Sequence, residues 1–340
     1  MVRLARHIAL KTRVNALLGA SKTRVNALSV LIAGALTFTV ADATVAQGYP
    51  DHPVRIIVSS AAGGPLDIVG RAVAERLAVG LKQPVVVEAR SGAGGNIAAD
   101  FVSKSPPDGY TLLFVLSSTL AVNPHLYKDL SFNLKPITVV NYSTQTLFVH
   151  PSLPLNNVTE FVAWAKKDGP VTYAHGGNGT SSHLVMEYFR LLAGFETVPV
   201  PYRGSSALVA DFITGQFKVA FGSTSGLLPQ AAAGKLRALA VSTAKRSPLL
   251  PDVPAVAEYY PGFELTTDFV LLAPGGTPDE IVARLEREVR QAIDTPEFRD
   301  RFSKQDIWIV ASTPAEAGAR IKTAFELWAD VVKRTGMKGE

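Results

Sequence analysis

The stretch Val54-Arg-Ile-Ile-Val-Ser59, followed by Ala61-Ala-Gly-Gly-Pro65 and then by Asp67–Leu81, decides the fold class. The first run is short, apolar and rich in β-branched residues, which is typical of a buried strand. The second is a glycine-rich turn. The third carries its apolar residues on one helical face, namely Ile68, Ala72, Val73 and Leu77. A strand that turns directly into a helix predicts a βαβ unit.

The same alternation continues along the chain. Ser91–Asn96, again rich in glycine, is expected to open a helix between the strands Pro84–Glu88 and Tyr110–Leu116. A second set of units begins near residue 150, and its first element is a helix capped by Asn157 and Glu160. Its predicted elements are strand Val171–Ala174, helix His183–Ala193, strand Val198–Tyr202, helix Ala207–Thr214, and strands Lys218–Phe221 and Leu236–Ser242. The pattern predicts two α/β lobes, each with a mainly parallel sheet flanked by helices.

Two more helices are predicted after the proline-rich segment Ser247–Phe263. Thr277-Pro278 with Glu280, and Thr313-Pro314 with Glu316, are typical of an N-cap, a proline at N1 and a glutamate at N3. We expect these helices to return to the first lobe. Lobe 1 would then be discontinuous, with residues 47–149 and 272–340, and lobe 2 would hold residues 150–271.

The residues before Gln47 have the layout of a secretory leader. Residues 1–46 hold six basic residues and one acid, Asp42, and the apolar run Ala27–Val40 is followed by small residues. That run of 14 residues is shorter than the roughly 20 that span a bilayer. We therefore predict that residues 1–46 are a cleaved signal peptide and that the protein is periplasmic. The mature chain should begin between Thr44 and Tyr49.

The composition of the remainder excludes several function classes. Removing the leader's charges from 34 basic and 29 acidic residues leaves 28 of each, so the body is neutral and a nucleic-acid partner is not expected. There is no cysteine, hence no disulfide and no thiolate metal site. Ile97 stands where the third glycine of a dinucleotide fingerprint belongs, and there is no P-loop. We expect no cofactor.

The sequence gives little support for catalysis. Gly222-Ser-Thr-Ser-Gly226 resembles a nucleophile elbow, but Thr224 occupies the nucleophile position. A secreted hydrolase that uses Thr224 or a serine stays as the enzyme alternative. His175 and His183 are eight residues apart with no acidic cluster beside them, so we expect satisfied or solvent-exposed histidines and no metal site.

One local arrangement recurs: a strand ends in a short Gly/Ser/Thr loop that opens into a helix. It occurs at Ala61–Asp67, Gly92–Asn96, His175–Ser182, Gly204–Ala207 and Gly222–Gly226. Such loops present backbone N–H groups at the positive end of a helix dipole, which suits a carboxylate. Any one loop is explained as a tight βα turn. Five of them indicate a ligand cleft at the carboxyl ends of the strands.

At these loops the chain resembles the Bug receptors, the periplasmic solute-binding proteins of tripartite tricarboxylate transporters. The similarity runs in order from about Tyr49 to the C-terminus. The motifs that carry it are Pro53-Val-Arg-Ile-Ile-Val58, Gly63-Gly-Pro-Leu-Asp67, Glu88-Ala-Arg-Ser-Gly-Ala-Gly-Gly95, Pro107-Asp-Gly-Tyr-Thr-Leu112, Ser117-Ser-Thr-Leu-Ala-Val-Asn-Pro124, Gly177-Asn-Gly-Thr-Ser-Ser-His-Leu184, Pro201-Tyr-Arg-Gly204, Gly234-Lys-Leu-Arg-Ala-Leu-Ala-Val241 and Leu250-Pro-Asp-Val-Pro254.

The resemblance implies a type II periplasmic-binding fold of two lobes joined by two crossovers, and it implies no catalysis. It also implies a small carboxylate ligand and the permease subunits of a tripartite tricarboxylate transporter as partners, with the receptor a monomer. In that family the ligand is held chiefly by two loops, here Gly63, Gly64 and Asp67, and Gly177, Asn178, Gly179, Thr180, Ser181 and Ser182. Ser117, Ser118, Gly204, Ser205, Ser206, Gly222 and Ser223 are on neighbouring loops expected to approach the cleft.

Three departures from the family bear on the ligand. Ser59-Ser60 replace the usual Pro-Phe or Pro-Tyr, and His175 replaces a small polar residue. Gly222 stands where relatives often have aspartate, so we expect a ligand with a carboxylate but no ammonium group. Only Asp67 and Arg203 are charged in the predicted loops, so backbone N–H groups at Gly63, Gly64 and 177–180 are expected to hold the anion. The sequence leaves open an alternative receptor that senses ligand without a transporter.

Overall fold

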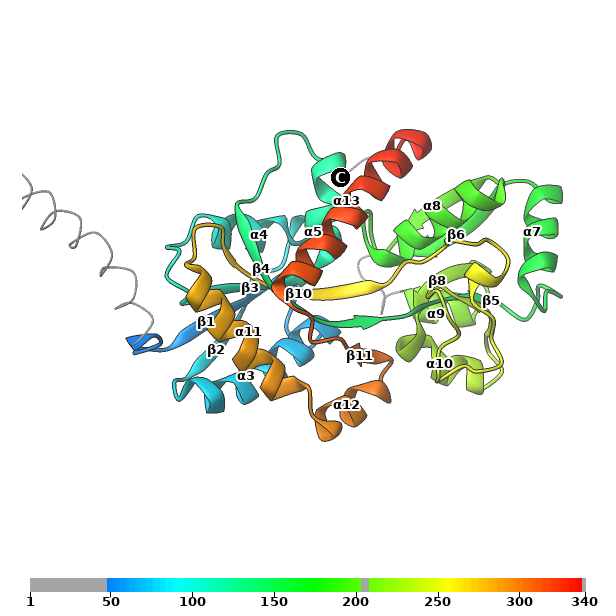
Figure 1. Ribbon diagram of the computed structural model, residues 1–340. Coiled ribbons are helices and arrows are strands. Elements are labelled where there is room, and N and C mark those ends of the chain that lie inside the picture. Colours follow the sequence, from blue (N-terminus) through cyan, green and yellow to red (C-terminus); the bar gives the residue numbers. More distant parts are fainter. Residues whose placement is uncertain (1–47, 203–207, 338–340) are drawn as a thin grey trace, which may run out of the picture. The chain divides into compact units, whose positions relative to one another are not determined.

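The computed structural model describes residues 48–202 and 208–337, and the predicted leader lies outside them. The described elements (Figure 1) follow in chain order: β1 Val54–Val58, α3 Pro65–Leu81, β2 Val85–Ala89, η1 Ala93–Gly95, α4 Asn96–Ser103, β3 Thr111–Leu116, α5 Ser117–Ala121, α6 Asn123–Leu126, β4 Leu134–Ser143, β5 Gln145–Val149, α7 Val158–Lys167, β6 Val171–His175, α8 Ser181–Ala193, β7 Thr197–Pro201, α9 Leu208–Ile213, β8 Val219–Ser223, α10 Thr224–Ala232, β9 Arg237–Val241, η2 Val256–Glu258, β10 Thr267–Pro274, α11 Asp279–Ile293, α12 Pro296–Ser303, β11 Ile307–Ile309 and α13 Pro314–Thr335.

The larger sheet has six strands in the order β11-β4-β10-β3-β1-β2. β1 pairs in parallel with β2 and β3, as the βαβ pattern predicts. β10 is antiparallel to β3 and β4, and β11 is antiparallel to β4. The prediction of a mainly parallel sheet is therefore wrong, because three of the five strand pairings in this mixed sheet are antiparallel. The cause is that β4 leads out of this lobe whereas β10 returns to it, so these two neighbours run in opposite directions.

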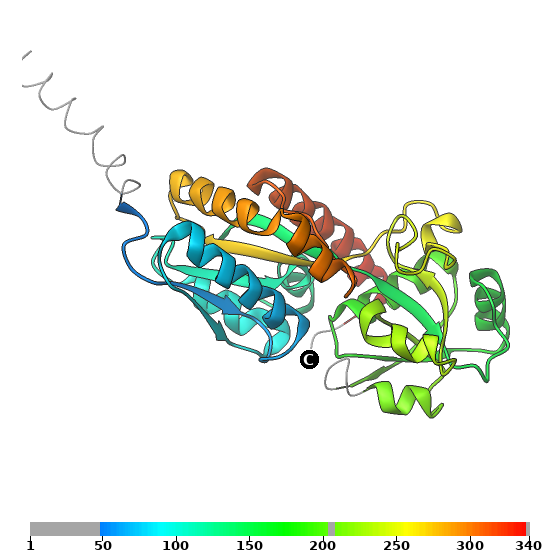
Figure 2. The same ribbon diagram turned by 90° about the horizontal axis from the view of Figure 1, so that it is seen from below.

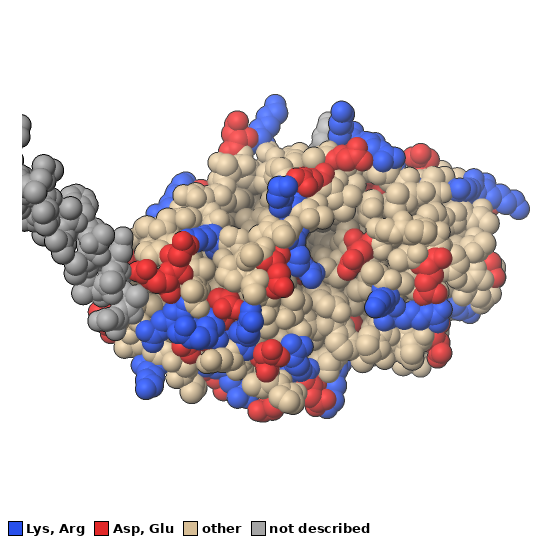
Figure 3. Space-filling model, viewed as in Figure 1, with Lys and Arg blue, Asp and Glu red and all other residues tan. Residues whose placement is uncertain are grey.

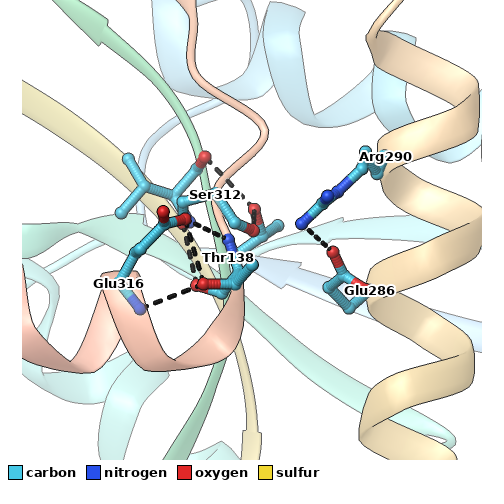
Figure 4. Close-up of polar contacts among 7 residues, drawn as sticks. Thr138, Glu286, Arg290, Ser312 and Glu316 are labelled. Carbon is cyan, nitrogen blue, oxygen red and sulfur yellow. Dashed lines mark hydrogen bonds and ion pairs between the residues drawn. The ribbon is translucent and has the colours of Figure 1, made fainter.

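Helices from distant parts of the chain cover this sheet (Figures 1 and 2). α11 packs against α3, and α13 runs along β4 and α5. Figure 4 shows the start of α13, where Thr138 Oγ1 donates to the Ser312 carbonyl at 2.7 Å. Thr313 and Glu316 form the predicted capping box there. The cap predicted at Thr277 is wrong, because Pro278 is the N-cap of α11 and Thr277 Oγ1 is buried without a partner.

The second lobe is built on two small sheets. β5 lies between β8 and β9 and is antiparallel to both, and β6 pairs in parallel with β7 beside β8. Its core is aromatic: the rings of Phe161, Phe189 and Phe195 contact one another at centroid distances of 5.4 to 6.0 Å. Trp328 and Val331 of α13 belong to the same core cluster. The C-terminal helix therefore contacts both lobes, although residues 272–340 were expected in lobe 1.

The chain passes between the lobes twice. Thr144 alone separates β4 of the large sheet from β5 of the second lobe, and Thr267 begins β10 on the return. β5 and the start of β10 thus lie outside the lobes to which the expected boundaries at 149 and 271 assign them. We therefore propose crossings at Thr144 and Thr266. The buried carboxylate of Asp306 accepts a hydrogen bond from Thr144 N–H at 2.9 Å, which fixes the first crossing to the large sheet.

Within the described residues, no helix has both the length and the apolar character needed to cross a bilayer. Figure 3 shows basic and acidic side chains interspersed over the face that it displays, in keeping with the neutral body of the chain.

Candidate functional site

A cavity of about 340 Å³ lies between the lobes, at the carboxyl ends of β1 and β3. Its first-lobe wall consists of Ser59, Ser60, Gly64, Pro65, Leu66, Gly92, Gly94, Gly95, Leu116, Ser118, Thr267, Phe269 and Ile307. Its second-lobe wall consists of Asn178, Gly179, Thr180, Ser181, Ser182, Ser223 and Ser225, and Ser143 and Gln145 line it at the first crossing. None of these described residues has an ionisable side chain. The volume suits a small metabolite.

In the loop that precedes α3, the carboxylate of Asp67 accepts the hydrogen bonds that hold the loop. Asp67 Oδ2 accepts from Gly63 N–H at 2.9 Å and from Arg71 Nε at 2.9 Å, and Asp67 is buried. The Arg71 hydrogen bond, reinforced by that of Gly63, lowers the pKa of Asp67, so the group is ionised. Asp67 therefore stabilises the first turn of α3 and does not line the cavity. Gly63 N–H, expected to hold a ligand, is already bound within the loop.

In the loop that precedes α8, two imidazoles accept the backbone hydrogen bonds that a carboxylate accepts in the first loop. His175 Nδ1 accepts from Gly177 N–H at 3.3 Å, and His183 Nδ1 accepts from Gly179 N–H at 3.2 Å. Ser182 Oγ accepts from Gly176 N–H at 3.1 Å, and Thr180 N–H donates to the Gly177 carbonyl. The expected ligand donors in residues 177–180 are thus largely bound inside the loop. The donors with no intrahelical acceptor are those of the first turn of α8.

The two histidines form a buried stacked pair, with ring centroids 4.3 Å apart and planes inclined by 15°. Burial lowers the pKa of both groups, and it lowers that of His183 to about 3. Both imidazoles are therefore neutral at pH 7 and can accept from the glycine N–H groups. The prediction of satisfied histidines is right for these acceptor nitrogens, but His175 Nε2 is buried without a partner.

A third loop, Gly92–Gly95, closes the first-lobe wall. A Cβ on Gly95, where φ is +95°, would lie 2.6 Å from Thr119 Oγ1. Thr119 Oγ1 and Asn123 Nδ2 both donate to the Gly94 carbonyl. The glycine is therefore required for the loop to lie this close to α5.

The loop at Gly222–Gly226 brings Ser223 and Ser225 to the cavity but not Thr224. Thr224 is fully buried, donates to the Thr144 carbonyl at 3.1 Å and bonds Thr146 Oγ1 at 2.7 Å. It therefore stabilises the first crossing and is closed to a substrate. A Cβ on Gly222 would collide with Leu227 Cδ1, so the leucine side chain would have to shift to admit any larger residue there.

The structure brings together eight of the predicted site residues on the cavity wall: Gly64, Ser118, Asn178, Gly179, Thr180, Ser181, Ser182 and Ser223. Gly63 N–H is bound to Asp67 and Gly177 N–H to His175 within their loops, Gly222 lies in β8, and Ser117 lines a neighbouring cavity. Gly204, Ser205 and Ser206 lie outside the described residues. The sequence missed Ser143, Gln145, Thr267, Phe269 and Ile307, which are brought to the cavity only by long-range strand pairing.

The described residues contain no group of three or more His, Asp or Glu side chains that could hold a metal ion. A neutral cavity between two α/β lobes, with a helix N-terminus on each side, is the arrangement of a solute-binding protein. The profile of the Tripartite tricarboxylate transporter family receptor matches residues 69–337. The chain belongs to this family, which is a family of receptors and not of enzymes.

Individual relatives support this family assignment. The chain is 35% identical over 300 residues to the protein BugT of Bordetella pertussis, covering 86% of this chain and 92% of that protein. It is similar to the periplasmic binding protein BugD, with 31% identity, a TM-score of 0.73 and coverage of 86% and 100% of the two chains. Rpa4515 of R. palustris with adipate has 30% identity and a TM-score of 0.76 (85% and 99% covered). MatC of Rhodopseudomonas palustris with malate has 27% and 0.73 (84% and 100%). The predicted two-lobed periplasmic-binding fold is confirmed.

Proposed function

We propose that this chain is an exported receptor that captures a small carboxylate between its lobes and delivers it to the permease of a tripartite tricarboxylate transporter. The observation that carries the proposal is the cavity of about 340 Å³, which has helix N-termini on both lobes and no acidic side chain among its described lining residues. Adipate and malate in two related structures support a carboxylate ligand.

Ligand contacts are assigned to the wall residues of both lobes. Gly64 and Ser118 would contact the ligand from lobe 1, and Asn178, Ser181 and Ser223 from lobe 2. Gly63, Asp67, Gly177 and Gly222 would act indirectly, by holding the loops that carry these groups. The lobes would turn about the crossings to enclose the ligand, as in other two-lobed binding proteins.

Export to the periplasm and a monomeric state are also part of the proposed function. Residues 1–46 would be removed on secretion, leaving a periplasmic monomer. N-terminal sequencing of the protein recovered from the periplasm tests this, because a first residue between Thr44 and Tyr49 is expected. Recovery of a membrane-embedded chain that retains residues 30–40 would contradict it.

A thermal-shift screen against small carboxylates tests the binding function. A ligand at about 100 times its Kd should add roughly 2.7 kcal/mol to the free energy of unfolding. Uptake of that ligand should then depend on this chain together with a neighbouring many-helix permease. Binding without any dependence of uptake would favour the alternative of a sensing receptor. Ester or amide turnover that disappears in Thr224→Ala would favour a hydrolase, which the burial of Thr224 opposes.

A further inference from the structure

The two walls of the cavity differ in chemistry. In the part that the structure describes, the second-lobe wall contains only glycine, serine, threonine and asparagine. The first-lobe wall carries five apolar residues: Pro65, Leu66, Leu116, Phe269 and Ile307. Leu116 and Phe269 are directly paired across β3 and β10, so their side chains share one face of the sheet. The apolar side chains of the cavity therefore lie on the first-lobe wall, beside four hydroxyl residues, and the second-lobe wall that faces them carries only polar side chains and glycine.

The helix that opens on each wall also differs in charge. The first turn of α3 already contains the carboxylate of Asp67, bound to Gly63 N–H and Arg71. The first turn of α8 contains no acid and begins with Ser181 and Ser182, both on the wall. A carboxylate in the first turn already interacts favourably with the helix dipole, and it repels a second anion placed beside it. An anionic group of a ligand therefore gains more at α8 than at α3.

We infer that the receptor orients its ligand, with the carboxylate on the second-lobe wall at α8 and an apolar body against Leu66, Leu116 and Phe269. This inference rests on the proposed carboxylate-binding function and narrows it to acids with one carboxylate and an extended hydrocarbon part. A second carboxylate on such a ligand would have to be desolvated against the apolar wall near Asp67, which is unfavourable.

Calorimetry with a chain-length series tests the apolar contact. Butanoate, pentanoate and hexanoate should bind with an affinity that rises roughly three- to fourfold for each methylene added, the value of a buried CH₂. Adipate has the same six carbons as hexanoate, with a carboxylate in place of the methyl group. Hexanoate should bind at least about tenfold more tightly than adipate.

A matched pair of charge insertions tests the orientation. Ser181→Asp places a carboxylate at the first position of α8, where it favours the helix and should not unfold the protein. It should weaken hexanoate binding by roughly a hundredfold or more, because the two anions would lie close together. Ser60→Asp places the same charge on the first-lobe wall, and it should weaken binding by no more than about tenfold. Thermal unfolding of both variants controls for stability.

The outcomes separate this inference from the function on which it rests. A rising chain-length series together with the larger effect of Ser181→Asp supports the orientation. Adipate bound more tightly than hexanoate, or a larger effect of Ser60→Asp, overturns the orientation and leaves a carboxylate receptor in place. If no monocarboxylate or dicarboxylate of the panel binds, the proposed function itself fails, and the orientation fails with it.

Discussion

The loop that opens α3 and the loop that opens α8 follow the same sequence pattern, in which a strand ends in glycines and a helix begins. In the first loop, Asp67 satisfies Gly63 N–H with a negative charge. In the second, His175 and His183 satisfy Gly177 and Gly179 N–H with neutral nitrogens. Two loops with one backbone plan therefore present different electrostatics to a ligand, one with a negative acceptor and one with neutral acceptors. The choice of acceptor behind the loop decides which of them attracts an anion.

The largest effect is expected from removing the charge behind the first loop. Asp67→Ala leaves Gly63 N–H without its acceptor and Arg71 without its partner. The free energy of unfolding should fall by about 2–3 kcal/mol, measured by urea denaturation. Asp67→Asn keeps an acceptor for Gly63 and should lose less. An unchanged stability with a complete loss of ligand binding would show that Asp67 contacts the ligand. The proposed difference between the two loops would then be wrong.

The next effect concerns ligands with an ammonium group. Asp67 is bound within its loop, and no acidic residue was found among the described residues of the wall. A buried ammonium without a counter-charge is unfavourable. Each carboxylate that binds should therefore bind at least about tenfold more tightly than its 2-amino derivative, for example hexanoate against norleucine and glutarate against glutamate. Calorimetry gives the ratio. A preference for the amino acid would indicate that the first loop offers a negative charge to the cavity.

The histidine pair makes the second loop sensitive to acid. Burial lowers the pKa of His175 and His183 below the ordinary 6.5, so the unfolded chain binds more protons than the folded one. Their contribution to stability is complete above pH 6.5 and is lost as the pH falls toward the folded pKa, which is about 3 for His183. For His183 the free energy of unfolding should fall by about 1.4 kcal/mol per pH unit within that window, and His175 adds a decline in the same direction.

His183→Asn is the matched control, because its side-chain oxygen can replace Nδ1 as the acceptor for Gly179 N–H and does not titrate there. Urea unfolding at pH 7.5, 6.0 and 5.0 should show a shallower decline for this variant than for the unsubstituted protein. Equal slopes would mean that the pair does not titrate on unfolding, and the contrast with the ionised first loop would lose its basis.

The smallest effect is expected from single hydroxyls of the second-lobe wall. Ser181→Ala should lose about 0.5–1.5 kcal/mol of binding free energy, the net value of one hydrogen bond. Ser182→Ala should lose more, because Ser182 Oγ also accepts from Gly176 N–H and so shapes the loop. Calorimetry on folded variants measures both. If Arg203→Ala abolished binding while both serine variants bound normally, a side-chain ion pair would be the anchor in place of the helix N-terminus.

Much of the fold follows from local pattern. Apolar runs followed by glycine-rich loops predict β1 and β6 with their following helices, the apolar run Tyr110–Leu116 predicts β3, and the Thr313 capping box predicts the start of α13. The directions of β4 and β10 could not be predicted in this way. Their pairing joins residues more than a hundred positions apart, and no local periodicity encodes which neighbour a strand will take.

The same limit applies to the site. The glycine and serine loops are visible in the sequence because a turn and a helix start need particular residues. Phe269 and Ile307 lie within ordinary apolar strands, and only the pairing of β10 and β11 with their neighbours brings them to the cavity. The sequence therefore predicts the polar half of the site better than its apolar half. The histidine acceptors also escaped prediction, because their role depends on the three-dimensional stack.

The single residue between β4 and β5 restricts how the receptor can move. Consecutive Cα atoms are about 3.8 Å apart and do not stretch, so Thr144 provides rotation and almost no translation. Its N–H is held by Asp306 of the first lobe, and its carbonyl by Thr224 of the second. Thr144 therefore acts as a pivot that is hydrogen-bonded to both of the lobes that it joins. In the proposed closure the lobes would therefore swing about this point and not slide past each other, so the mouth of the cavity would travel farthest while the groups beside Thr144 stay almost still.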